Sequence, residues 1–398
     1  MARISRENYL QGIINEKDKK IIKIISGVRR SGKSTLLELF QKHLLESGVD
    51  KSQIISINFE DIDFEDLKNY KKLHTYIKER MLPDKMNYIF LDEIQHVDGY
   101  EKAVDSLYIK ENVDLYLTGS NAYFLSSDLA TLLTGRFLEL KILPLSFKEF
   151  CQGDYSNLDE KFADYIKRSS FPYNIAVGNN EAQSKKYLED LYASILYRDV
   201  VKRLKVSDAI SLENLADFMF HNIGNLLNPT NIANTLTSAG KKIDVKTVDK
   251  YMKGLTDSML FYRVNRFNIK GKQFLSANPK YYAVDMAMRN MRVGGRDTDA
   301  GHLLENIVYL ELQRRYKHVF VGEVEDGKVD FVVKDGDEYL YFQVTDTMLN
   351  EKTAVREVTP LKKIADNYPK TILTSDSIFS EGNIEGIKKV NVLKWLCD

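Results

Sequence analysis

The sequence is poor in the residues that mark several classes of protein. Its two cysteines, Cys151 and Cys397, lie far apart and show no paired spacing, which argues against a disulfide scaffold and against a cysteine-based zinc site. No apolar run reaches the roughly 18 residues that a membrane helix needs, and residues 1–12 contain no apolar signal core. We therefore expect a protein of the reducing cytoplasm with no membrane partner.

The chain also has a formal net charge of zero. The chain has 57 Lys and Arg residues against 57 Asp and Glu residues, so any surface that binds nucleic acid must be a local one. With 43% hydrophobic and 29% charged residues, the composition is that of a globular protein. A length of 398 residues suggests two or three domains.

What is present in the N-terminal part is a regular alternation of strand and helix patterns. Strands are predicted over residues 21–25, 54–59, 88–91, 113–117 and 137–143, and helices over 33–47, 66–81 and 99–110. Short apolar strands that alternate with helices indicate a parallel sheet buried on both faces. Pro144 ends the pattern, so the first predicted domain covers residues 1–145.

A phosphate-binding motif follows the first predicted strand and precedes a predicted helix. Residues 27–34 fit the pattern G-x-x-x-x-G-K-[ST], in which glycines let the chain curl around phosphates and backbone N–H groups favour the anion. Lys33 is expected to contact the β and γ phosphates, and Ser34 to hold Mg²⁺. The residues predicted to bind the nucleotide are Gly27, Val28, Arg29, Arg30, Ser31, Gly32, Lys33, Ser34 and Thr35.

An acidic pair ends the third predicted strand. Asp92 and Glu93 are expected at the carboxyl edge of the sheet, where phosphates bind in such folds. Asp92 is predicted to hold Mg²⁺ together with Ser34, and Glu93 to polarise an attacking water. Because a water nucleophile needs orientation and a base, this pair favours hydrolysis of ATP over binding alone.

Two further polar positions are candidates for the same chemistry. After the fourth strand, Asn121 or its neighbour Ser120 could hydrogen-bond the phosphate or the water; the alternative is an ordinary polar turn. Before the fifth strand, Arg136 could stabilise charge on the transferring phosphate, in its own site or in a neighbour's. The alternative for Arg136 is a surface ion pair.

Residues 1–145 resemble AAA+-type P-loop ATPases. The motifs that carry the resemblance are GVRRSGKST, IFLDEIQHV, LTGSNAYFLS and LTGRFLELKILPLSFKEF, and they are similar to those of archaeal and bacterial AAA+ proteins with a C-terminal domain of unknown function. The resemblance extends over nearly the whole chain. It implies ATP binding and hydrolysis, with Lys33, Ser34, Asp92 and Glu93 in the roles given above, and it offers no agreed physiological substrate.

The region from 207 to 290 resembles a winged helix-turn-helix, because three predicted helices precede a predicted hairpin. Between residues 240 and 272 there are nine Lys and Arg against three Asp and Glu, which suits contact with DNA phosphates. The candidate DNA contacts are Lys246, Lys250, Lys253, Arg263 and Arg266. The alternative is a solvated lysine face on a lid or a protein-docking module.

The last hundred residues resemble the PD-(D/E)xK nuclease fold and depart from its chemistry. Glu305, Asp330 and Gln343 stand at the metal-binding positions, where Gln343 replaces an acid and forms a weaker ligand. The lysine position holds Thr345; Lys363 could substitute for it. We expect a degenerate fold in which these three residues are a candidate second metal site.

The sequence thus predicts an α/β protein with four parts: a P-loop ATPase domain (1–145), a helical lid (146–206), a winged-helix-like domain (207–290) and a nuclease-like domain (291–398). We expect an ATPase that uses ATP and Mg²⁺ and whose cycle moves the C-terminal half, with DNA as a candidate partner. The alternatives are a slow ATP-dependent switch or scaffold for a protein partner, and an ATP-powered metal-dependent nuclease. An oligomer is compatible with each.

Overall fold

The computed structural model describes residues 4–120, 133, 135–178, 180–295, 300–325, 327–378 and 381–398. The chain forms two compact units. Unit 1 contains residues 1–144 with Asp257–Met259, and unit 2 contains Leu145–Thr256 with Leu260–Asp398. Among the helices in these ranges, none combines the length and the hydropathy needed to cross a bilayer.

Unit 1 is built on a five-stranded parallel sheet with the order β2-β3-β4-β1-β5. The strands are β1 (Ile22–Gly27), β2 (Ile54–Asn58), β3 (Asn87–Asp92), β4 (Val113–Gly119) and β5 (Phe137–Ile142). All five predicted strands are therefore present. Every residue of β1, β3 and β4 is buried, as expected for central strands covered on both faces.

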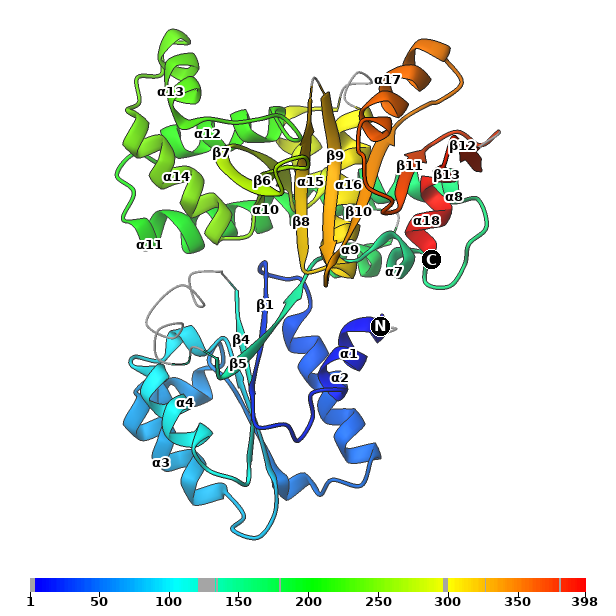
Figure 1. The fold of residues 1–398 in the computed structure, drawn as a ribbon. Coiled ribbons are helices and arrows are strands. Elements are labelled where there is room, and N and C mark those ends of the chain that lie inside the picture. The colour runs from blue at the N-terminus through cyan, green and yellow to red at the C-terminus, as the bar shows by residue number, and fades with distance from the viewer. Residues whose placement is uncertain are drawn as a thin grey trace. The chain divides into compact units, whose positions relative to one another are not determined.

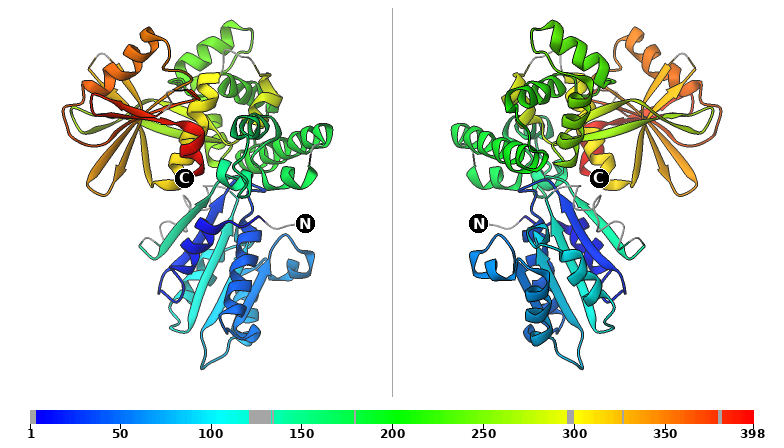
Figure 2. Two further views of the ribbon diagram at one scale, coloured as in Figure 1. Left: turned by 90° about the vertical axis from the view of Figure 1, so that its right-hand side faces the viewer. Right: turned by 90° about the vertical axis from the view of Figure 1, so that its left-hand side faces the viewer.

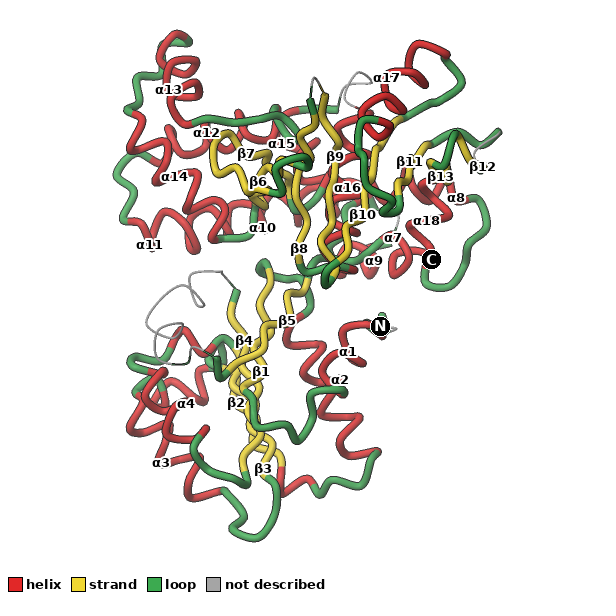
Figure 3. The backbone as a smooth tube through the Cα atoms, in the orientation of Figure 1, coloured by secondary structure: helices red, strands yellow, loops and turns green. Residues whose placement is uncertain are grey.

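Helices cover the two faces of this sheet in pairs (Figures 1 and 3). On one face α1 (Glu7–Ile14) and α2 (Lys33–Glu46) pack against Ile25, Phe90 and Tyr116. On the other face α3 (Tyr70–Arg80) and α4 (Tyr100–Tyr108) pack against a second apolar cluster. The predicted helix 66–81 begins four residues late because a 3₁₀ helix, η2 (Ile62–Leu67), comes first and the Asn69 side chain caps α3.

Unit 2 begins with helices. These are α7 (Phe147–Cys151), α8 (Leu158–Arg168), α9 (Pro172–Val177), α10 (Glu181–Ser194), the π-helix η4 (Ile195–Val201), α11 (Lys202–Leu204), α12 (Ala209–His221), α13 (Pro229–Ser238) and α14 (Val245–Asp257). The predicted three helices and hairpin are present as α12, α13 and α14 followed by β6 (Phe261–Asn268) and β7 (Gln273–Ala283).

The second sheet of the molecule has eight strands in the order β12-β13-β11-β10-β9-β8-β6-β7. The remaining elements are α15 (Met286–Val293), α16 (Ala300–Arg315), β8 (His318–Val324), β9 (Gly327–Asp335), β10 (Glu338–Thr345), α17 (Glu351–Lys362), β11 (Lys370–Thr374), β12 (Gly382–Ile384), β13 (Ile387–Asn391) and α18 (Val392–Cys397). Its strands fan out across one another, as in a twisted sheet (Figure 2). Helix α16 packs on the face of the sheet that carries the Phe331 side chain. Helix α17 packs on the opposite face, against Val332.

The hairpin does not stand apart from this sheet. Strand β6 pairs in parallel with β8, with Arg266 opposite Val321 and Asn268 opposite Glu323. The parts predicted as 146–206, 207–290 and 291–398 therefore lie in one compact unit, and the boundary at 290 crosses a continuous sheet. The sequence pattern gave no sign of this pairing, because it joins strands about fifty residues apart.

Candidate phosphate-binding site

The predicted site residues of unit 1 meet at the carboxyl edge of its sheet. Gly27 pairs with Ile142 at the end of β5, and Ser26 pairs with Gly119 at the end of β4. Asp92 ends the neighbouring strand β3. Parallel strands deliver their carboxyl ends to one edge, so the turn 27–33, the acidic pair and the end of β4 converge there.

The turn after β1 has the backbone that its glycines make possible. A Cβ on Gly27 would lie 2.4 Å from the carbonyl oxygen of Ile142, so only glycine fits. Gly32 and Arg30 both have positive φ, at 98° and 67°, before α2 begins at Lys33. Within the described part of the chain, the buried Ser31 hydroxyl is one of the side-chain groups without a hydrogen-bond partner, as expected of a group that would bond a phosphate oxygen.

A residue far upstream braces this turn. The guanidinium of Arg6, which is 4% exposed, donates to the carbonyl oxygens of Ser31 (2.9 Å) and Leu143 (2.8 Å). The contact ties the turn to the segment after β5. Sequence reasoning missed Arg6 because it lies 25 residues before Ser31 and carries no local motif.

Lys33 points into the turn and toward the acidic pair. Its Nζ donates to the carbonyl oxygen of Gly27 (3.1 Å) and to Oγ of Ser120 (2.7 Å), and lies 3.5 Å from Oε1 of Glu93. Burial lowers the pKa of Lys33, while the neighbouring carboxylates act in the opposite direction. Ser120 is therefore the residue after β4 that the structure brings to the site; Asn121 lies outside the described residues.

Asp92 and Glu93 are both buried, but their pKa values shift in opposite directions. Burial raises the pKa of Asp92, against hydrogen bonds from Ser34 and Thr118. For Glu93 burial also acts to raise the pKa, but Lys33 and the hydrogen bond from Ser120 outweigh it, so that its pKa lies below the usual range. Glu93 is thus charged at neutral pH, as a carboxylate that accepts a proton must be.

The hydroxyl of Ser34 and the carboxylate of Asp92 are adjacent, since the two side chains share a hydrogen bond. Together they present the hard oxygen ligands that Mg²⁺ prefers. The chemistry of this donor pair fits the ion expected from the sequence. It would leave most coordination positions to water and phosphate oxygens, as is usual for Mg²⁺.

Two of the other arginines predicted to belong to the site, Arg29 and Arg136, form ion pairs. Arg29 is 8% exposed and donates to Oε1 of Glu60 at 2.9 Å. Arg136 lies at the opposite edge of the sheet, because its carbonyl accepts from the amide of Ile22 at the start of β1. Its side chain pairs with Asp105 of α4 at 2.7 Å. From Ile22 to Gly27 the strand rises about 16 Å, which places the backbone of Arg136 well away from the turn 27–33.

The second candidate cluster lies on the large sheet. Glu305 of α16 accepts hydrogen bonds from Lys280 Nζ (2.7 Å) and the Tyr282 hydroxyl, both on β7. Burial and the charge of Glu305 raise the pKa of Asp330 on β9 to about 7, against the charge of Lys280. The lysine in this cluster is therefore Lys280; Lys363 bonds the carbonyl oxygen of Glu325 instead.

Gln343 also belongs to the second cluster. Its Oε1 accepts from the amide of Asp330 (3.3 Å), and its Nε2 donates to Glu357 of α17 (2.6 Å). The structure thus brings Glu305, Asp330 and Gln343 together. Within the described ranges, however, no group of three or more His, Cys, Asp or Glu side chains is arranged to hold a metal ion.

The candidate DNA contacts fall into two groups. Lys246, Lys250 and Lys253 are exposed on α14, whose opposite face packs into the core through residues such as Tyr251. Arg263 on β6 is exposed. Arg266 forms an ion pair with Glu323 of β8, so its charge is already compensated.

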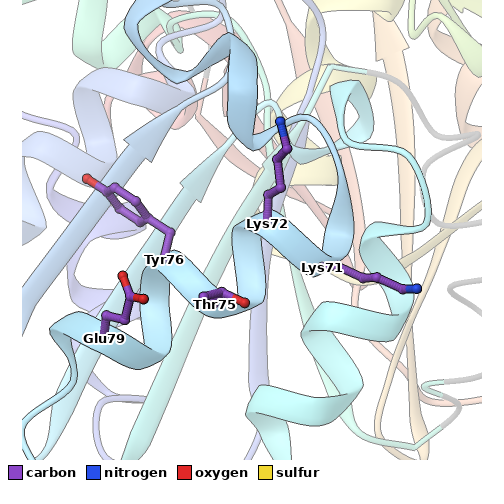
Figure 4. Close-up of a pocket in the computed structure, with 5 residues that line it drawn as sticks. All are labelled: Lys71, Lys72, Thr75, Tyr76 and Glu79. Carbon is purple, nitrogen blue, oxygen red and sulfur yellow. The ribbon is translucent and has the colours of Figure 1, made fainter.

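A surface pocket lies on α3 and is separate from these clusters. It is lined by Lys71, Lys72, Thr75, Tyr76 and Glu79, side chains of this one helix (Figure 4). It shares no residue with the turn 27–33 or with the acidic pair. We therefore assign it no part in the phosphate-binding site.

A five-stranded parallel sheet with this turn after β1 and an acidic pair after β3 defines the AAA class of P-loop domains. Residues 19–151 match the family described as an AAA domain, and residues 159–299 match a domain of unknown function. The fold of the chain is similar to that of a Walker-type ATPase of Pyrococcus abyssi, with a TM-score of 0.50 and 14% identity over 73% of this chain and 96% of that one.

Two relatives match along most of their length. An uncharacterized protein of Haemophilus influenzae is 38% identical over 401 residues, with 99% of each chain covered. An uncharacterized protein of Methanocaldococcus jannaschii is 30% identical over 398 residues, with 93% of this chain and 84% of that protein covered. The chain therefore belongs to the same family as these two proteins, and within it the AAA domain is the part whose class is known.

Proposed function

We propose that this protein binds ATP with Mg²⁺ and hydrolyses its β–γ phosphoanhydride bond. The observation that carries the proposal is the convergence of Lys33, Ser34, Asp92 and Glu93 at one edge of a parallel sheet, around a turn whose buried Ser31 hydroxyl has no hydrogen-bond partner among the described residues. Anions are favoured there by the start of α2.

Each residue has one task in this proposal. The Lys33 ammonium exchanges its bond to Ser120 for phosphate oxygens, and this exchange frees Glu93 from its closest cation. Ser34 and Asp92 would hold Mg²⁺, which when bound neutralises charge on the phosphates. The charged carboxylate of Glu93 then orients a water and accepts its proton.

The test is ATP turnover by the wild type, Lys33→Ala and Glu93→Gln, with calorimetric titration of Mg²⁺-ATP. Lys33→Ala should lose binding and turnover. Glu93→Gln should keep binding and lose roughly 10²–10⁴-fold in kcat. Glu46→Gln, an exposed change at the far end of α2, is the control. A wild type that shows neither heat of binding nor turnover would overturn the proposal.

A slow nucleotide switch that serves a protein partner is the second candidate. It is supported by the contacts of Glu93, whose carboxylate is held by Lys33, Ser120 and Gln95. If these contacts persist with nucleotide bound, ATP would bind with little turnover. Glu93→Gln would then change the basal rate by less than about 3-fold, far below the loss expected of a general base.

The proposal includes DNA contact through α14 in a winged helix made by α12, α13, α14 and the β6–β7 hairpin. Three exposed lysines on one helix face support it. Replacement of Lys246, Lys250 and Lys253 by Ala should lower the slope of log K against log salt by about 2.7, at about 0.9 per phosphate contact. The triple change at Lys71, Lys72 and Lys78 on α3 is the control. No retention of the wild type on duplex DNA at low salt would remove this part.

Two of the roles predicted from the sequence are proposed in a narrower form. A charge-stabilising role for Arg136 is proposed for the site of a neighbouring copy alone, which makes oligomerisation part of the test of Arg136→Ala. We propose that the nuclease-like cluster of Glu305, Asp330 and Gln343 serves structure or binding. Its support is the Lys280–Glu305 pair, which already gives Glu305 a cationic partner.

A further inference from the structure

Glu93 adopts a backbone conformation that is unusual for its residue type. Its φ is 55° and its ψ is 45°, the left-handed region that favours glycine. Side-chain-bearing residues persist there only where the surroundings hold them, and such residues cluster at functional sites. The position follows directly after β3, so the conformation decides where the Glu93 carboxylate points.

One hydroxyl holds this turn. Oγ1 of Thr118 accepts a hydrogen bond from the amide of Glu93 (2.8 Å) and donates its own hydrogen to Oδ1 of Asp92. Thr118 is fully buried on β4, the strand beside β3. The Thr118 hydroxyl thus donates its single hydrogen to one residue of the pair and accepts from the backbone of the other.

The turn directs the Glu93 carboxylate back into the site. There the carboxylate accepts from Ser120 and lies 3.5 Å from Nζ of Lys33. In an extended strand the next side chain would point to the opposite face from its predecessor. The left-handed turn instead brings the carboxylates of Asp92 and Glu93 to the same side, where both act on Lys33, although they are consecutive residues.

We propose that Thr118 is a positioning residue for hydrolysis, which fixes Asp92 and Glu93 relative to each other through a single hydroxyl. The inference rests on the proposed function of the site and deepens it. Thr118 touches neither phosphate nor water in this role; it acts through the two carboxylates.

The test compares Thr118→Val, which is close in shape and lacks the hydroxyl, with Thr118→Ser, which keeps it. Thr118→Val should lower kcat at least about 10²-fold, the lower range for loss of a positioned base. Its affinity for ATP should change less than 3-fold in calorimetry, because Lys33 and the turn are untouched. Its Mg²⁺ requirement should increase, because the Asp92 carboxylate loses the hydroxyl that fixes its orientation. Thr118→Ser should stay within about 3-fold of the wild type in kcat.

A general loss of stability must be separated from lost positioning. Thr374→Val is the matched control, since Thr374 is also fully buried on a strand and donates to a carboxylate, that of Asp376 in unit 2. A kcat of Thr118→Val equal to that of the wild type, or a parallel decline in both valine variants, would overturn the inference. If Thr118→Val does not fold, Thr118→Ala carries the same comparison.

If the wild type has no turnover, the proposed function is contradicted, but the inference about Thr118 can still be tested by structure. Crystal structures of Thr118→Val and Thr118→Ala should show Glu93 relaxed from its positive φ and its carboxylate away from Ser120. A variant structure in which φ stays near 55° and the bond to Ser120 persists would show that the hydroxyl is dispensable.

Discussion

Lys280 shows how far the role of one residue depends on its surroundings. It is 7% exposed, and its ammonium is 2.7 Å from Oε1 of Glu305, which also accepts from Tyr282. Burial acts to lower the pKa of Lys280, but the charges of Glu305 and Asp330 outweigh it and raise the pKa above its usual value. The lysine is therefore charged, and removal of its partner would leave that charge buried.

A double-mutant cycle tests this ion pair. Lys280→Met and Glu305→Gln should each destabilise the protein by about 3–5 kcal/mol, because each leaves one buried charge without its counterion. The double variant should regain most of that loss. The measurement is urea unfolding of all four proteins. Single losses that simply add in the double variant would contradict the ion pair.

Asp330 should make stability depend on pH. Its folded-state pKa of about 7 lies above the ordinary aspartate value of 3.8, so the folded state holds the proton more tightly. The stabilisation is fully present below about pH 4 and is lost as pH rises through about 7. Asp330→Asn should flatten this part of the unfolding profile, whereas Asp335→Asn, exposed on the same strand, should not. An unchanged profile in Asp330→Asn would contradict the assignment.

The positions of single residues in the candidate site could be predicted when their chemistry is encoded locally. Lys33, Ser34 and Asp92 lie where the motif and the end of a strand place them. Arg6 and Thr118 could not be predicted, because each acts through a contact between segments distant in the chain. Arg136 was assigned to its own site as one option because sequence spacing does not say which sheet edge a residue occupies.

At the scale of elements, α14 depends on one glycine for its packing. A Cβ on Gly254 would lie 2.5 Å from Cδ1 of Leu204 and 3.0 Å from Cγ1 of Val200, so a larger side chain would push α11 and η4 away. Gly254 is needed for the close approach of α14 to α11 and η4, and not for a turn.

Gly254→Val should therefore destabilise the protein by about 1–3 kcal/mol, the usual cost of overpacking. Gly301→Val on α16 is the control, because a Cβ there meets nothing within 4 Å. Thermal unfolding of both variants measures the difference. Equal melting temperatures would show that α11 and η4 shift at no cost.

Helices and strands were predicted correctly where a single hydrophobic period dominated a segment. The five strands of unit 1 are short apolar runs between helices, and their pattern is unambiguous. The elements after β10 were not predicted, because β12 has three residues, α17 contains Pro360 and β11 is a short run without strong flanking signals. The parallel pairing of β6 with β8 is a long-range choice that no local pattern encodes.

At the scale of the whole molecule, the two compact units predict where the chain can be divided. A fragment of residues 291–398 would lose β6 and β7, and with them one of the two partner strands of β8 and the Lys280 and Tyr282 side chains that bond Glu305. Such a fragment should not unfold cooperatively, whereas residues 145–398 should. Circular dichroism melts of the two fragments measure this. A cooperative transition in residues 291–398 would show that the hairpin is dispensable.

The shared sheet of unit 2 also constrains how this family can diversify. Genetic exchange that replaced α12–α14 and the hairpin as a cassette would have to supply a new strand in register with β8. Recombination points inside unit 2 should therefore be rare among surviving descendants.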